Sequence, residues 1–357
     1  MRAQRTALTL ALLGALIAAS LFGRSEAEVP PAPAEQPRSP AALETIRPGG
    51  DAPARARDDD AARSAGLREA ILSARWGSEL GAFGRHEAAE SNPEAPMAIA
   101  AAGDELLVLD QVNGRIQRFR DGRAISAFTV PDTAQDVALT RDGRVLVLDR
   151  LGGGALAIHG ANGELLQEIG LRGRGVEDPG ALTGVFADAD GIYVEREHGS
   201  LVRVADSSGV EDAERPELPG RPSRDGSLIV TAAIVDPAAG RVVVTAFDRR
   251  TLEPRWSLPL ALDAMVLRLL LLDSDPDGNV YLAAETAHEG PAPDFRLSQV
   301  EVRALRMDGA GRITGRLTLP PLASGDEMLR PLAIDEEGRL YALQSESSGG
   351  RVDRWVF

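Results

Sequence analysis

The stretch that decides the fold is residues 142–148, DGRVLVL, in which an Asp-Gly pair precedes a run of aliphatic residues. Such a pair beside apolar runs is typical of a β-hairpin, because glycine accepts the positive φ that a tight turn requires. The same combination recurs throughout the chain beyond residue 67. The turn pairs are Gly103-Asp104, Asp142-Gly143, Asp190-Gly191, Asp225-Gly226, Asp277-Gly278 and Glu337-Gly338.

The spacing of these turns predicts the architecture. Their glycines advance by 40, 48, 35, 52 and 60 residues, about 47 on average. A period of this size is typical of one four-stranded propeller blade with loops of variable length. Six copies therefore predict an all-β fold, a six-bladed β-propeller of four-stranded blades, which occupies residues 67–357.

The two ends of this region indicate how the ring closes. The last residues, 352–357, resemble the third strand of a blade, so the chain ends one strand short. Residues 71–84, with Trp76 and Phe83, have the character of an outer strand. We expect this N-terminal strand to pair beside residues 351–357 and complete the C-terminal blade, because ring closure hides two exposed sheet edges.

One blade carries a recognisable motif. Residues 107–119 read LVLDQVNGRIQRF. This stretch resembles the NHL-repeat family of six-bladed propellers, whose signature is V-x-D-x-x-N-x-R-[IV]-x-x-[FY]. In the other blades the motif decays: Asp149 keeps the acid, whereas Glu195 and Gln344 replace it. The resemblance implies a propeller that binds proteins or small ligands on one face of the ring, and it implies no reaction.

The N-terminal residues have the pattern of an export signal. Arg2 and Arg5 precede an apolar run from Ala7 to Phe22, and a small-x-small cleavage pattern follows at residues 25–27. We predict a signal peptide over residues 1–27 and a disordered linker rich in Pro, Ala, Arg and Asp over residues 28–66. The protein would then be periplasmic or secreted. The alternative is an uncleaved anchor that holds the domain on the outer side of the membrane, the only membrane contact that we expect.

Composition excludes several classes of chemistry. All 39 basic residues are Arg, 54 residues are Asp or Glu, the net charge is −15, and there is no Cys. The acidity argues against a nucleic-acid partner, since such partners are bound largely through cationic contacts to phosphate. Without Lys there is no Schiff-base chemistry, and without Cys there is no thiol nucleophile or thiolate metal site.

The candidate site lies on the face that carries the blade links and the loops between second and third strands. These loops begin near Asp110, Asp149, Glu195, Asp236, Glu285 and Gln344. The longest, from Glu285 to Arg296, could overhang the central channel. The sharpest hypothesis is that Glu195, His198, Glu285 and His288 converge to hold a divalent cation, Ca²⁺, Mg²⁺ or Zn²⁺, or to supply a general base.

The alternative for this face is a solvated acidic rim, which we favour because charged loop residues are mostly exposed. Further candidates on the same face are Asp110, Asn113, Asp149, Glu197, Glu289 and Glu346. For Asp110 the motif has a structural interpretation, in which the carboxylate stabilises the hairpin with Arg115 as its ion partner.

Two functions remain open at this point. The first is an exported, non-enzymatic propeller that binds a protein or a small ligand through its loop face. The second is a metal-dependent lyase or lactonase-like hydrolase that uses the Glu and His residues at the channel mouth. No catalytic residue is assigned, and the lack of a recognisable catalytic set favours binding.

Overall fold

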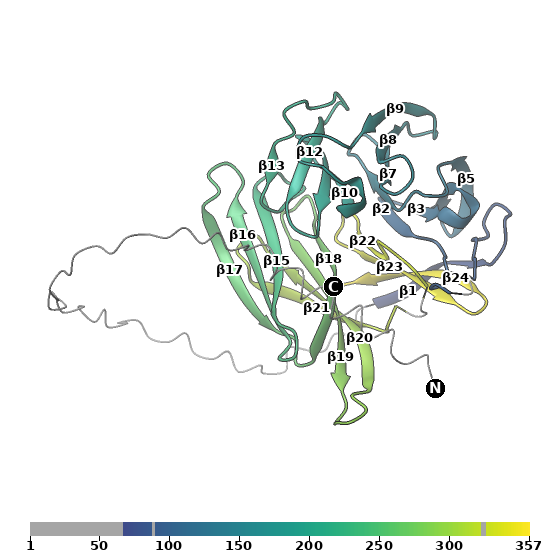
Figure 1. Ribbon diagram of the computed structural model, residues 1–357. Coiled ribbons are helices and arrows are strands. Elements are labelled where there is room, and N and C mark those ends of the chain that lie inside the picture. Colours follow the sequence, from purple (N-terminus) through teal and green to yellow (C-terminus); the bar gives the residue numbers. More distant parts are fainter. Residues whose placement is uncertain (1–66, 88–89, 323–325) are drawn as a thin grey trace, which may run out of the picture. The chain divides into compact units, whose positions relative to one another are not determined.

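The computed structural model describes residues 67–87, 90–322 and 326–357, which form an all-β propeller (Figure 1). Six antiparallel sheets of four strands each follow one another along the chain. The predicted fold class is therefore confirmed. The predicted signal peptide and linker, residues 1–66, lie outside the described residues. Within the described part of the chain, no helix is long and apolar enough to cross a membrane.

Five blades are continuous in sequence, and each begins with its innermost strand. Blade 1 consists of β2 (Ala98–Ala102), β3 (Glu105–Asp110), β4 (Arg115–Arg120) and β5 (Arg123–Thr129). Blade 2 consists of β6 (Asp136–Leu139), β7 (Val145–Asp149), β8 (Ala155–His159) and β9 (Leu165–Gly170). Blade 3 consists of β10 (Leu182–Ala187), β11 (Gly191–Arg196), β12 (Leu201–Asp206) and β13 (Glu217–Leu218). Blade 4 consists of β14 (Arg221–Pro222), β15 (Leu228–Asp236), β16 (Arg241–Asp248) and β17 (Pro254–Ala261). Blade 5 consists of β18 (Met265–Ser274), β19 (Val280–Glu289), β20 (Leu297–Met307) and β21 (Ile313–Leu319).

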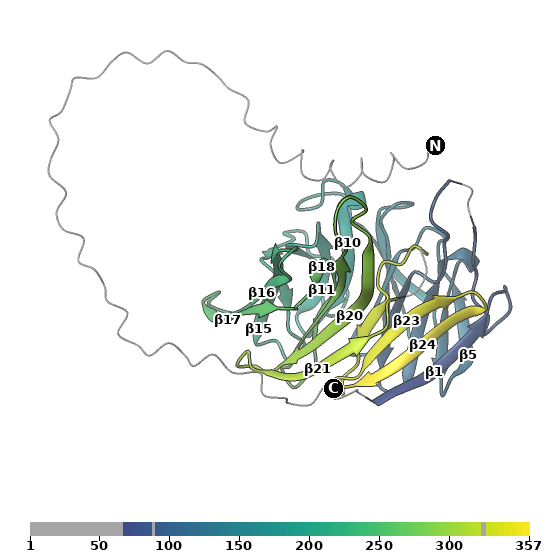
Figure 2. The same cartoon turned by 90° about the horizontal axis from the view of Figure 1, so that it is seen from below.

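Blade 6 closes the ring. It joins β22 (Leu332–Ile334), β23 (Leu340–Glu346) and β24 (Gly349–Val356) to the N-terminal strand β1 (Leu67–Arg75). Strand β1 runs antiparallel to β24, from Leu67 opposite Val356 to Arg75 opposite Gly349. Figures 1 and 2 show the purple β1 lying along the yellow β24. The predicted closure is confirmed.

The predicted bounds of the closing strand, 71–84, are wrong in their second half. The strand ends at Arg75, and the chain then turns back so that Trp76 bridges Phe83. Phe83 is fully buried and packs edge-to-face on Phe119 of blade 1, with 5.7 Å between ring centroids. The aromatic residues that suggested a longer strand instead pack at the junction between the last and first blades.

The six predicted turns all join the first and second strands of a blade, as expected. Three of them share a hydrogen-bonded clamp that the sequence pattern does not predict. A carboxylate just before the turn accepts backbone N–H bonds from the turn and a hydrogen bond from a Tyr hydroxyl in the second strand. The pairs are Asp188–Tyr193 at 3.2 Å, Asp275–Tyr281 at 2.7 Å and Asp335–Tyr341 at 2.9 Å.

The core is divided among the seams between neighbouring blades. Five clusters of buried apolar side chains fill the seams between blades 1 and 2, 2 and 3, 4 and 5, 5 and 6, and 6 and 1. Among the described residues, no such cluster joins blades 3 and 4. Two-residue strands lie on either side of this seam, β13 as the outer strand of blade 3 and β14 as the first strand of blade 4. The seam between blades 3 and 4 therefore needs a different source of cohesion.

Blade 5 carries a long hairpin in place of the predicted loop from Glu285 to Arg296. Strand β19 continues to Glu289, and only residues 290–296 connect it to β20. Glu285 is therefore a mid-strand residue, paired with Val302 of β20. In Figure 1 the β19–β20 hairpin extends well beyond the neighbouring strands.

Candidate functional site

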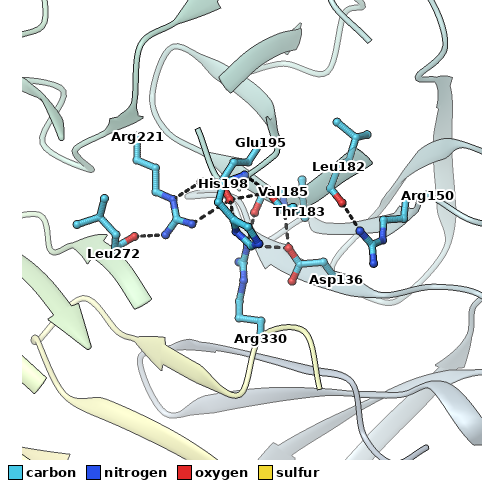
Figure 3. A network of polar contacts seen from close by, with 10 residues as sticks. All are labelled: Asp136, Arg150, Leu182, Thr183, Val185, Glu195, His198, Arg221, Leu272 and Arg330. Carbon is cyan, nitrogen blue, oxygen red and sulfur yellow. Dashed lines mark hydrogen bonds and ion pairs between the residues drawn. The ribbon is translucent and has the colours of Figure 1, made fainter. Parts of the chain in front are cut away.

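The loop face of the propeller is the face where first strands begin and second strands end. At the mouth of the central channel, this geometry brings together residues from blades that are distant in sequence (Figure 3). Asp136 begins β6, Arg221 begins β14, and Arg330 precedes β22. Glu195 lies near the end of β11, and Phe186 lies in the first strand of the same blade.

Arg330 links three blades. From blade 6, its Nη2 lies 2.6 Å from Oδ2 of Asp136 in blade 2 and donates to the carbonyl oxygen of Val185 in blade 3 at 2.8 Å. Asp136 is fully buried, and its carboxylate also accepts the backbone N–H of Val185 at 2.8 Å. Burial raises the pKa of the Asp136 carboxyl, and the Arg330 guanidinium opposes this shift. Without Arg330, this buried carboxylate would lose the cation that compensates its desolvation.

Arg221 makes the corresponding link between blades 3 and 4. Its Nε and Nη2 bind Glu195 in a bidentate pair, at 2.8 and 3.0 Å from Oε1 and Oε2. Thr183 donates its hydroxyl to the same carboxylate at 2.9 Å. Burial alone would raise the pKa of Glu195, but the charge of Arg221 and hydrogen bonds from His198, Arg221 and Thr183 together lower it to about 2. Glu195 is therefore ionised, and a weak base, at neutral pH.

The Phe186 ring contacts both guanidinium groups. The Cζ atom of Arg221 is 4.4 Å from the ring centroid, and that of Arg330 is 4.6 Å from it. Both distances are typical of cation–π contacts. Because Phe186, Arg221 and Arg330 come from blades 3, 4 and 6, this stack connects three blades at the channel mouth.

Arg150, which follows β7, adds a further cation. It donates to the Gln135 side chain and to the Leu182 carbonyl, both at 2.6 Å. No carboxylate in the described part of the chain pairs with it. The network of Figure 3 thus contains the ion pairs of Arg221 with Glu195 and of Arg330 with Asp136, together with Arg150, which binds neutral acceptors. This network therefore has three guanidinium groups and two carboxylates, although the chain as a whole has a net charge of −15.

Of the four residues expected to converge, the structure brings together only Glu195 and His198. Nδ1 of His198 lies 3.7 Å from Oε2 of Glu195, and the His198 side chain is 74% exposed. Glu285 is paired with Arg268 instead, at 2.9 Å, and His288 is exposed near the end of β19. In the described residues, no group of three or more His, Asp or Glu side chains is arranged to hold a metal ion. Arginine side chains take the place that a cation would have beside Glu195 and Glu285.

Each of the other loop-face candidates either makes hydrogen bonds or an ion pair within the protein or is exposed to solvent. Asp110 is buried and accepts from Arg115 Nε at 2.8 Å and from Asn113 Nδ2 at 2.9 Å, which confirms its interpretation as a hairpin stabiliser. Asp149 accepts the backbone N–H groups of Gly152 and Gly153. Glu346 pairs with Arg351 at 2.7 Å. Glu197 and Glu289 are exposed.

Sequence reasoning missed the residues that build the channel mouth, namely Asp136, Arg150, Phe186, Arg221 and Arg330. Both Arg221 and Arg330 stand directly before a proline at or near the start of a first strand. Proline is tolerated at the first residue of a strand. Arg-Pro also occurs at residues 47–48 and 215–216, so this pair alone does not identify the arginines of the channel mouth.

Comparisons with known proteins add little to this geometry. No protein-family model matches the chain, and no curated protein matches it. Among solved structures, hydrazine synthase from Kuenenia stuttgartiensis is 14% identical, with a TM-score of 0.47 over 69% of this chain and 72% of that one. A gluconolactonase from Xanthomonas campestris is 16% identical, with a TM-score of 0.44 over 81% and 88%.

A third neighbour is virginiamycin B lyase from Staphylococcus aureus, in an inactive variant. It is 11% identical, with a TM-score of 0.39 over 73% of this chain and 80% of that one. We draw no conclusion on function from similarities of this size. The assignment of the fold rests on the strand pairing described above.

Proposed function

We propose that this chain is an exported, non-catalytic β-propeller that binds a protein partner through its loop face. Export rests on the signal-peptide pattern of residues 1–27. The observation that carries the binding proposal is the projecting β19–β20 hairpin of blade 5. Strand β19 is a second strand, so its far end lies on the loop face.

The tip of this hairpin presents apolar side chains to solvent. Phe295 is 55% exposed and Leu297 is 47% exposed. Residues 291–299 are all exposed. Phe295 and Gln299 have φ values of 44° and 49°, in the left-handed backbone region that residues other than glycine rarely adopt. A two-stranded ribbon of this kind gains little stability of its own, and exposed aromatic residues on such a surface are typical anchors for a protein partner.

The channel mouth supports a binding role over the metal-dependent lyase or lactonase alternative. Asp136 is bound by Arg330, and Glu195 is bound by Arg221 and Thr183. A carboxylate held as an ion pair, with its pKa lowered to about 2, is poorly suited to general base catalysis near neutral pH. These ion pairs instead fix the blades that carry the loop face.

We further propose that blade 1 is an NHL-type repeat. The contacts of Asp110 with Asn113 and Arg115 support this, because the three residues of the motif form one hydrogen-bonded unit. Arg115 also donates to the carbonyl oxygens of Ser78 at 2.7 Å and Ala82 at 2.9 Å. The motif therefore ties the N-terminal segment to blade 1.

A photo-crosslinking residue at position 295, introduced in the producing cell, tests the proposed function. We expect discrete adducts that disappear when Leu297→Ser is added. The matched control is the same crosslinker at position 166, since Leu166 is 54% exposed on the outer strand β9. Adducts of the same masses and yields from both positions would contradict a binding surface at the hairpin.

A further inference from the structure

A second region of the molecule has the features of a small-molecule site. A cavity of about 320 Å³ lies on the seam between blades 3 and 4. This volume is at the lower end of the range for ligand pockets. The cavity lies toward the face opposite the loop face, because Asp190 belongs to the turn between β10 and β11. Its lining consists of Asp190, Tyr193, Arg203, Pro216, Leu218 and Arg249.

Local sequence explains why the space exists at this seam. The outer strand of blade 3, β13, is only two residues long, and no apolar cluster joins the two blades among the described residues. Gly191 lets the Arg203 side chain lie close to the turn, since a Cβ atom at this position would come within 2.7 Å of Arg203 Cδ. A larger residue at 191 would displace Arg203 from the wall of the cavity.

Ion pairs fix the polar wall of the cavity. Arg249 from blade 4 binds Asp188 at 2.6 Å, Asp190 at 2.9 Å and the Tyr193 hydroxyl at 2.9 Å, all in blade 3. Arg203 uses its Nε and Nη2 on Asp212, at 2.8 and 2.5 Å. Neither Nη1 of Arg203 nor Nε of Arg249 has a hydrogen-bond partner in the described part of the chain. Two positioned guanidinium groups therefore retain N–H donors.

The lining as a whole combines three kinds of group. The unused guanidinium donors suit a carboxylate. Asp190, whose side chain is 62% exposed, can accept from an ammonium group. Pro216 and Leu218 offer an apolar wall. A ligand with one charge of each sign would satisfy both polar walls without changing the net charge of the seam.

We propose that this cavity binds a zwitterionic amino acid or dipeptide with apolar side chains. The carboxylate binds between Arg203 and Arg249, the ammonium group binds Asp190, and the side chain packs on Pro216 and Leu218. This site lies at a different place from the hairpin of blade 5, so it stands independently of the protein-binding role. Occupation would also join blades 3 and 4 at the seam that lacks an apolar cluster.

Isothermal titration calorimetry of the full chain with L-leucyl-L-leucine tests this proposal. We expect saturable binding with one site. The N-acetylated and the C-amidated dipeptide should each bind at least about tenfold more weakly, because each lacks one charged group. Failure of the unmodified dipeptide to bind at about 10 mM, or equal binding of all three compounds, would overturn the proposal.

Two matched variants locate the site. Asp190→Asn should weaken binding of the dipeptide at least about fivefold. Asp277→Asn, which changes the equivalent exposed residue of the same turn in blade 5, should leave binding unchanged. Melting temperatures close to that of the unsubstituted chain show that both variants fold. Equal effects of the two substitutions would place the dipeptide elsewhere and contradict the assignment.

Discussion

The seam between blades 5 and 6 and the seam between blades 3 and 4 solve the same packing problem in different ways. At the first, Leu319, Leu332 and Leu340 are fully buried in one apolar cluster that belongs to both blades. At the second, Arg221 and Arg249 from blade 4 bind Glu195 and Asp188 in blade 3. Apolar burial is non-directional, whereas ion pairs require fixed partners. The polar seam can therefore hold a cavity without exposing a large apolar surface.

Among the substitutions that test this comparison, those that break the Arg221–Glu195 pair should change the free energy of unfolding most. Arg221→Met leaves Glu195 as a buried carboxylate without its cation, which we expect to lower the free energy of unfolding by about 3–5 kcal/mol. The double variant Arg221→Met/Glu195→Met should recover most of this loss, since apolar residues often replace a buried ion pair without cost. Urea denaturation measures both. A double variant as unstable as the single one would show that the polar pair is irreplaceable at this seam.

The tyrosine clamps give a smaller and more local test. Tyr193→Phe removes a bond to Asp188 and one from Arg249 across the polar seam, and should cost about 2–3 kcal/mol. Tyr341→Phe removes the equivalent clamp to Asp335 and a contact with Arg354, both within blade 6, and should cost about 1.5 kcal/mol. Thermal and urea unfolding of the two variants measure the difference. If Tyr341→Phe cost as much as Tyr193→Phe, the bond across the seam would contribute nothing.

Acid should weaken the polar seam through Glu195. The pKa of this residue is lowered from its ordinary value of 4.5 to about 2, so its ionised form stabilises the fold at neutral pH. This contribution declines as the pH falls from about 4.5 toward 2. When the pH is lowered from 5 to 3, the free energy of unfolding of Glu195→Gln should fall by about 2 kcal/mol less than that of the unsubstituted chain. Parallel curves of unfolding free energy against pH would contradict the role of this carboxylate.

The sequence predicts the ring better than the site because the two depend on different kinds of information. The turn glycines and apolar runs lie within single hairpins, so their spacing reveals six blades and the closing strand. The pairs at the channel mouth, such as Arg330 with Asp136, join residues 194 positions apart. No local pattern reports such a pair before the ring is formed. The Arg-Pro pairs at residues 221–222 and 330–331 do not mark these arginines either, since Arg-Pro also occurs at residues 47–48 and 215–216.

The errors of placement arise from contacts between segments that the local sequence does not reveal. Trp76 and Phe83 suit a strand by residue type, but they seal a turn because Phe83 packs on Phe119. Glu285 has the charge expected of a loop, but its partner Arg268 on the neighbouring strand allows β19 to continue to Glu289. In both cases a tertiary contact overrides the preference of a short stretch of sequence.

Native-state hydrogen exchange at low denaturant concentration tests the central claim, that the ring is held at one seam by ion pairs and at the others by apolar packing. We predict that β10, β11 and β15, which border the seam between blades 3 and 4, exchange through a partial opening. The free energy of this opening should be lower than the free energy of the opening that allows exchange in β18, β19, β22 and β23, which border the seam between blades 5 and 6. Equal opening free energies at the two seams would contradict this account.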